Sequence, residues 1–142
     1  MKDENYQARS SRIGRAYERQ VEAGLENQGW TIKKTKWREP LADIEIDIVA
    51  VDPDGVETWI ECKGSLSGSR AGAKRTDSVK KFIGDCALVF AMYEQNSEHE
   101  RRPYLLITSD LPEHGSAHRQ LEAAVAQGWC KIARFPMQIE FL

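Results

Sequence analysis

The feature of this chain that most constrains its fold is a pair of strand-like stretches joined by a turn. Residues 43–51 read DIEIDIVAV, in which acidic and aliphatic residues alternate before the run becomes wholly apolar. That pattern is typical of a strand entering a buried sheet. Residues 56–63 (VETWIECK) also alternate, and the intervening Asp-Pro-Asp-Gly is a strong turn signal. The sequence therefore predicts a β-hairpin within a larger sheet.

Periodicity on either side of the hairpin predicts alternating helices and strands. In residues 10–28, apolar side chains recur every four positions, and Gly29 supplies a stop signal. The other predicted elements are an exposed strand (30–37), a turn (38–40), a loop (64–75), a helix (76–93), a buried strand (104–108), a helix (116–127) and a last strand (130–135). This order predicts an α/β fold with a mixed central sheet flanked by helices.

Length and composition favour one globular domain. The chain has 142 residues, 41% hydrophobic and 30% charged, which suffices for one α/β domain over residues 1–142. No apolar run approaches the roughly 20 residues of a membrane span, and the polar start predicts a cytoplasmic location. The three cysteines, Cys62, Cys86 and Cys130, lack CxxC spacing, and we expect them to be buried thiols.

The hairpin also carries the strongest candidate for a reactive site. Side chains alternate along a strand, so Glu61 and Lys63 point to one face, and Asp47 on the paired strand can lie opposite them. Two carboxylates this close repel each other unless a cation lies between them. Oxygen ligands suit Mg²⁺ or Mn²⁺, so we expect a metal at Asp47 and Glu61, assisted by the main-chain carbonyl of Cys62.

The Glu-x-Lys triplet gains its meaning from its context. About one such [DE]-x-K triplet is expected by chance in a chain of this composition, and Glu61 begins the one that occurs. Its position at the end of a strand, after a buried-strand aspartate, favours a catalytic interpretation. The alternative is a surface Glu–Lys pair at a sheet edge.

Three stretches resemble a known superfamily of nucleases. GRAYERQVEAGLENQGW, EIDIVAVD and WIECKGS are similar to the PD-(D/E)xK, or restriction-endonuclease-like, superfamily, above all to its Holliday-junction-resolvase-like and Mrr-like branches. The resemblance covers roughly residues 13–90, and Ile46 stands where the family name has proline. It implies an αβββαβ core over about 10–108, with an αβ extension over about 109–142.

The resemblance also implies roles for single residues. Asp47 corresponds to the metal-binding aspartate of the family, Glu61 and Lys63 to its catalytic pair, and Glu18 to its helical glutamate. Glu18 would then be a further catalytic or metal-shell residue. The alternative for Glu18 is a solvated side chain paired with Arg15 or Arg19.

A basic segment follows the predicted site, although the net charge is −2. Residues 63–81 hold six basic residues against one acidic residue, together with three glycines and several hydroxyl groups. Such a segment favours phosphate binding, and the alternative is an ordinary solvated loop. The predicted nucleic-acid-binding residues are Ser65, Arg70, Lys74, Arg75, Lys80 and Lys81.

Together these features favour a Mg²⁺- or Mn²⁺-dependent endonuclease, bacterial or phage-encoded, that hydrolyses nucleic acid, with DNA preferred over RNA as its partner. A homodimer stays open. Two alternatives keep the fold without the chemistry: a catalytically silent nucleic-acid-binding module, and an assembly protein of a phage or defence system. The complete set of Asp47, Glu61 and Lys63 argues against a silent module, because a decayed site usually loses one of them.

Overall fold

The computed structural model describes residues 6–64, 76–135 and 139–142, which form three helices and six strands. The helices are α1 (Tyr6–Asn27), α2 (Thr76–Gln95) and α3 (Gly115–Ala126). The strands are β1 (Thr31–Glu39), β2 (Ile44–Val51), β3 (Glu57–Lys63), β4 (Tyr104–Thr108), β5 (Lys131–Arg134) and β6 (Glu140–Phe141).

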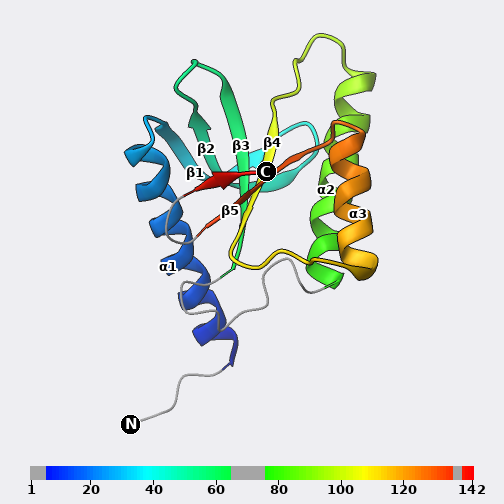
Figure 1. Ribbon diagram of the computed structural model, residues 1–142. Helices are drawn as coiled ribbons and strands as arrows, with labels where there is room; N and C mark the ends of the chain where they lie inside the picture. Colours follow the sequence, from blue (N-terminus) through cyan, green and yellow to red (C-terminus); the bar gives the residue numbers. More distant parts are fainter. Residues whose placement is uncertain (1–5, 65–75, 136–138) are drawn as a thin grey trace.

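All six strands form one mixed sheet in the order β1-β2-β3-β4-β5-β6. The β3–β4 and β4–β5 pairs are parallel, and the other three pairs are antiparallel. Helix α1 covers one face of the sheet, while α2 and α3 cover the other (Figure 1). Burial on both faces explains why β4, with the sequence YLLIT, is apolar almost throughout.

The hairpin predicted from the sequence is confirmed. Strands β2 and β3 are antiparallel, with Val51 opposite Glu57 and Ile48 opposite Ile60. The Asp52 carboxylate closes the turn by accepting the backbone N–H groups of Asp54 (2.9 Å) and Val56 (2.8 Å). Short-range turn chemistry therefore fixes the register that brings the two strands together.

The predicted α/β fold is confirmed, with three corrections to its elements. Helix α1 begins at Tyr6 rather than at residue 10. Strand β1 continues through Arg38 and Glu39, which pair with β2, so the predicted turn at 38–40 starts too early. Strand β6 has no counterpart in the prediction, because two residues are too few to show a periodic pattern. The domain limits stay predictions.

The three cysteines are buried free thiols, as expected from their apolar surroundings. Within the described ranges, no helix combines the length and the apolar content that crossing a membrane requires.

A buried carboxylate anchors the connection between β1 and β2. Glu39 is fully buried, and its side chain accepts the N–H groups of Leu41 (3.0 Å) and Ala42 (2.6 Å). The same carboxylate accepts the hydroxyl of Tyr93, on α2, at 2.6 Å. These bonds hold the β1–β2 connection against α2, and so fix where β2 begins.

We predict that Glu39→Ala destabilises the fold by about 3 kcal/mol, because three donors lose a buried charged acceptor. Tyr93→Phe, which removes one donor only, should cost about 1 kcal/mol. Urea denaturation of the two variants and the wild type measures both values. A Glu39→Ala midpoint equal to that of the wild type would show that this carboxylate does not hold the connection.

Candidate active site

The hairpin brings Asp47 and Glu61 together, where β2 and β3 separate. Ile48 and Ile60 form the last regular pair, so Asp47 and Glu61 are the next residues in register. There the Asp47 carboxylate, rather than a main-chain carbonyl, accepts the N–H group of Cys62, at 2.9 Å. The two predicted metal-binding carboxylates are therefore neighbours, as the sequence predicts.

Glu61 lies in a buried and electrostatically unbalanced position. Its side chain is almost fully buried, and the hydroxyl of Tyr104 donates to its Oε2 at 3.4 Å. Burial raises the pKa of Glu61 well above its usual value, and the charge of Asp47 and a hydrogen bond with Asp47 raise it further. Lys63 lowers this pKa, with its Nζ 3.7 Å from Oε1 of Glu61. Burial and the Asp47 carboxylate thus disfavour the ionised form of Glu61, and Lys63 offsets this only in part.

Glu18 approaches the same pair from α1. Its side chain is half-buried, and burial, followed by the charge of Asp47, raises its pKa to about 7. Lys36 of β1 opposes this shift. Among the described side chains, Glu18 forms no ion pair with Arg15 or Arg19. This arrangement favours the site role of Glu18 over the solvated alternative.

A cleft of about 410 Å³ opens beside the two carboxylates. Arg38 and the acidic residues Asp43 and Glu45 line it from the start of the β1–β2 hairpin, and Lys81 and Asp85 line it from α2. The structure thus brings Lys81 to the site. Lys80 lines a different cavity, between α2 and α3, and the predicted residues Ser65, Arg70, Lys74 and Arg75 lie outside the described residues.

The sequence prediction missed Asp85, Arg38 and Tyr104. Burial raises the pKa of Asp85, whereas Lys81 and Lys63 lower it, so this carboxylate belongs to the same electrostatic cluster. Asp85 follows Lys81 by four residues, so both lie on one face of α2. This spacing is a sequence signal that could have found Asp85. No comparable signal marks Tyr104, since its contact with Glu61 depends on the β3–β4 pairing.

The donor set at Asp47 and Glu61 fits a hard divalent cation. Across the described residues, no group of three or more His, Cys, Asp or Glu side chains is arranged to hold a metal. The fit therefore depends on two carboxylates, which suits Mg²⁺, a cation that keeps several waters and takes one or two protein carboxylates. The contribution of the Cys62 carbonyl stays a prediction.

Close packing fixes the backbone that follows Lys63. The N–H group of Ser109, just after β4, donates to the Lys63 carbonyl at 3.3 Å. A Cβ atom on Gly64 would lie 2.2 Å from Oγ and 2.8 Å from the backbone nitrogen of Ser109. Only glycine fits there, so this contact holds the end of β3 and the base of the Lys63 side chain.

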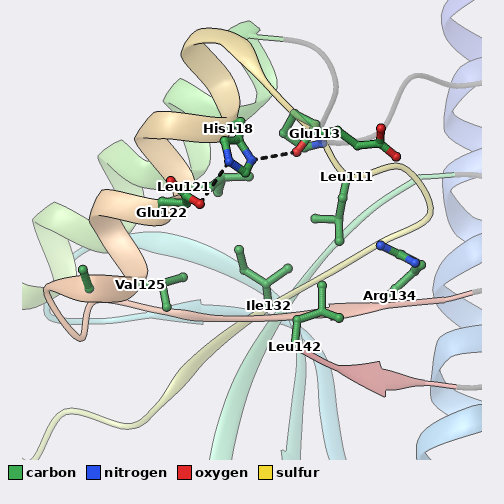
Figure 2. A pocket seen from close by; sticks show the side chains of 11 residues that line it. Leu111, Glu113, His118, Leu121, Glu122, Val125, Ile132, Arg134 and Leu142 are labelled. Atoms are coloured by element: carbon green, nitrogen blue, oxygen red, sulfur yellow. Dashed lines mark hydrogen bonds and ion pairs between the residues drawn. The ribbon is translucent and has the colours of Figure 1, made fainter.

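A cavity larger than the carboxylate cleft lies elsewhere and lacks comparable chemistry. It measures about 710 Å³, lies between α3 and the end of the sheet, and is lined mainly by apolar side chains such as Leu121, Val125 and Ile132 (Figure 2). The ring nitrogens of His118 lie 3.1 Å from the carbonyl oxygen of Pro112 and 3.0 Å from Glu122. Size alone therefore favours this cavity, whereas convergent charged groups favour the carboxylate cleft.

Comparisons with known proteins agree with this architecture, although no family model matches the chain. A UPF0102 protein from Desulforapulum autotrophicum is 39% identical over 70 residues, a match covering 49% of this chain and 55% of the relative. The chain thus spans about half the length of the curated relative it matches.

Two solved structures are similar in fold. An XisH family protein from Nostoc punctiforme superposes with a TM-score of 0.54 at 15% identity, covering 89% of this chain and 98% of its own. EndoMS in complex with double-stranded DNA superposes with a TM-score of 0.52 at 15% identity, covering 86% of this chain and 44% of its own. The α/β fold expected from the resemblance is thereby confirmed, since the chain shares its fold with these two proteins.

We predict that Gly64→Ala both destabilises the fold and displaces Lys63, because the added methyl group collides with the backbone of Ser109. Gly84→Ala on α2 is the matched control, since a Cβ atom there meets nothing within 4 Å. Thermal unfolding of both variants tests the contact. Equal unfolding temperatures for the two variants would contradict it.

A second prediction concerns pH. The folded-state pKa of Glu18 is about 7, above the ordinary 4.5 of the unfolded chain. Protonated Glu18 therefore contributes to the free energy of unfolding. This contribution is complete below pH 4.5 and is lost as the pH rises to about 7. Glu18→Gln should raise the unfolding temperature by about 3 °C at pH 8 in chelator, after discounting for solvent screening, and by almost nothing at pH 4.

The exposed residue Glu26, on the same helix, supplies the control for this measurement. Glu26→Gln should leave the unfolding temperature unchanged at both pH values. An identical effect of the two substitutions at pH 8 would show that Glu18 is not in the electrostatic cluster.

Proposed function

We propose that this chain is a metal-dependent nuclease that hydrolyses phosphodiester bonds in DNA. The observation that carries the proposal is the pair of adjacent carboxylates, Asp47 and Glu61, with the ammonium group of Lys63 3.7 Å from Glu61. This combination can hold a divalent cation and a phosphate side by side.

Asp47 and Glu61 would bind the cation. Their mutual repulsion, together with the burial of Glu61, makes the ionised pair costly, and a cation between them would offset that cost. When bound, a divalent cation supplies Lewis-acid polarisation of a phosphoryl oxygen and a lowered pKa for a coordinated water. The Cys62 N–H group keeps the Asp47 carboxylate oriented toward Glu61.

Lys63 would act on the reacting phosphate. Its ammonium group lies beside Glu61 and is only partly exposed, so its charge acts in a poorly solvated region. A compact cation there can stabilise the negative charge that develops as water attacks phosphorus, and can orient the attacking water. Packing of Ser109 on Gly64 helps to hold the main chain of Lys63 during this step.

Two observations favour DNA as the substrate. A protein of similar fold, EndoMS, is found in complex with double-stranded DNA. In this chain, Arg38 and Lys81 line the cleft and suit a phosphate backbone. The alternative is a catalytically silent nucleic-acid-binding or assembly module, and the complete set of Asp47, Glu61 and Lys63 argues against a silent module. A homodimer and a cytoplasmic location stay predictions.

The test is cleavage of a labelled panel of duplex, single-stranded and branched DNA, and of RNA, with Mg²⁺ or Mn²⁺. We expect cleavage of DNA that chelator abolishes. Lys63→Ala should reduce the cleavage rate by at least roughly 100-fold, because the charge that stabilises the transition state is lost. Its affinity for DNA should change little, since one contact adds little to a multi-phosphate grip.

Lys131→Ala on β5 serves as the control, because it removes an equal charge from a side chain outside the cleft. Cleavage at the wild-type rate by Lys63→Ala would overturn the role of Lys63. Tight DNA binding without cleavage of any substrate would favour the silent module.

A further inference from the structure

Strand β1 is an edge of the sheet and carries four basic side chains, Lys33, Lys34, Lys36 and Arg38. Lysines on an edge strand often serve only to prevent pairing with other chains. Two of the four fit that role, because contacts within the protein already engage their charges. Lys33 forms an ion pair with Glu57, and the ammonium of Lys34 lies 4.0 Å from the centre of the Trp37 ring.

Lys36 differs from these two. The residues on either side of it, Thr35 and Trp37, pair with Ile48 and Ile46, which places Lys36 directly across from Asp47. Its side chain is exposed and forms no hydrogen bond or ion pair with other described residues. It nevertheless lies close enough to Glu18 to lower the pKa of that carboxyl. Lys36 is thus a cation at the rim of the carboxylate cluster that no hydrogen bond or ion pair with the described side chains holds in place.

The backbone at Lys36 has an unusual conformation for a lysine. Its φ of 49° is left-handed, a region that side chains rarely adopt and that glycine occupies easily. Backbone geometry alone would therefore favour glycine at this position. A lysine there is better explained by its charge than by its conformational preference.

Arg38 continues the same edge into the cleft. It lies opposite Glu45 in the β1–β2 register and lines the cleft together with Asp47 and Glu61. Its Nη1 donates to the Asp43 carbonyl at 3.0 Å and lies 4.0 Å from the exposed Asp43 carboxylate, so that one guanidinium nitrogen makes both contacts while the side chain stays 60% exposed. The remaining donors of Arg38 are available to a ligand.

We infer that Lys36 and Arg38 form a phosphate-binding edge, along which the nucleic-acid backbone runs from β1 into the carboxylate cleft. The inference rests on the proposed function. A polyanion that must reach two carboxylates needs cations placed beside them, and these two cations lie there with donors to spare. Phosphate contacts of this kind hold the backbone in place without reading its sequence.

Affinity for a 20-nucleotide single strand and for its duplex tests this inference, measured by fluorescence anisotropy across a salt series. Ca²⁺ replaces Mg²⁺, so that cleavage does not interfere with binding. The test variant combines Lys36→Gly, which suits the left-handed backbone, with Arg38→Gln, which keeps a donor for Asp43. The control combines Lys33→Gln with Lys34→Gln, which removes the same charge from the same strand.

Log affinity falls as log salt rises. Each lost phosphate contact lowers the steepness of this slope by about 0.7 for single strands and about 0.9 for duplex. We expect the test variant to lower the slope by about 1.4 and 1.8, and the control to keep the wild-type slope. An unchanged slope in the test variant would overturn the inference, as would equal flattening by test and control. Absence of any DNA binding by the wild type would also overturn it.

Cleavage measured on the same proteins separates this inference from the proposed function. If Lys63→Ala abolishes cleavage while the test variant keeps the wild-type slope, the function stands and the phosphate-binding edge is wrong. If the wild type cleaves nothing but the test variant loses slope, the edge stands and the nuclease is wrong.

Discussion

The electrostatic conflict between Asp47 and Glu61 is the constraint on which the rest of the site depends. Two carboxylates side by side, one of them buried, oppose folding unless something compensates for their charge. The hairpin register, which the Asp52 turn sets, determines the positions of both residues and places them side by side. Lys63, Tyr104 and the Cys62 amide each soften the conflict, and none of them removes it.

Side chains from both faces of the sheet approach this pair of carboxylates. Glu18 comes from α1 on one face of the sheet, and Asp85 and Lys81 come from α2 on the other. The pair lies where β2 and β3 separate, so that side chains from both faces reach it. Burying one carboxylate beside others lowers the stability of the fold. Such a cost is common where a protein binds a cation or performs chemistry.

Much of the fold could be predicted from the sequence, because its signals are local. Alternation in residues 43–51 and 56–63, the Asp-Pro-Asp-Gly turn and the four-residue period of α1 each report a nearby structural preference. The same locality explains the misses. Strand β6 is too short to carry a pattern. The nearby Pro40 favours a turn at Arg38, which in the structure belongs to β1.

The candidate site was partly predictable for the same reason. Asp47, Glu61 and Lys63 belong to one hairpin, so strand geometry alone places them together. Asp85 joins them only through the packing of α2 on the sheet, and Lys36 only through the β1–β2 register. Such long-range contacts leave no mark in the local pattern. The site role of Glu18 stays a prediction from the family resemblance, because its helix spacing alone favours a solvated glutamate.

Anomalous diffraction from crystals soaked in Mn²⁺ tests the central claim most directly, since it locates the cation without depending on activity. We predict one strong peak between the carboxylates of Asp47 and Glu61, absent from crystals of Asp47→Asn. A peak located elsewhere, or none at this pair at saturating Mn²⁺, would show that the carboxylate conflict is not resolved by a metal.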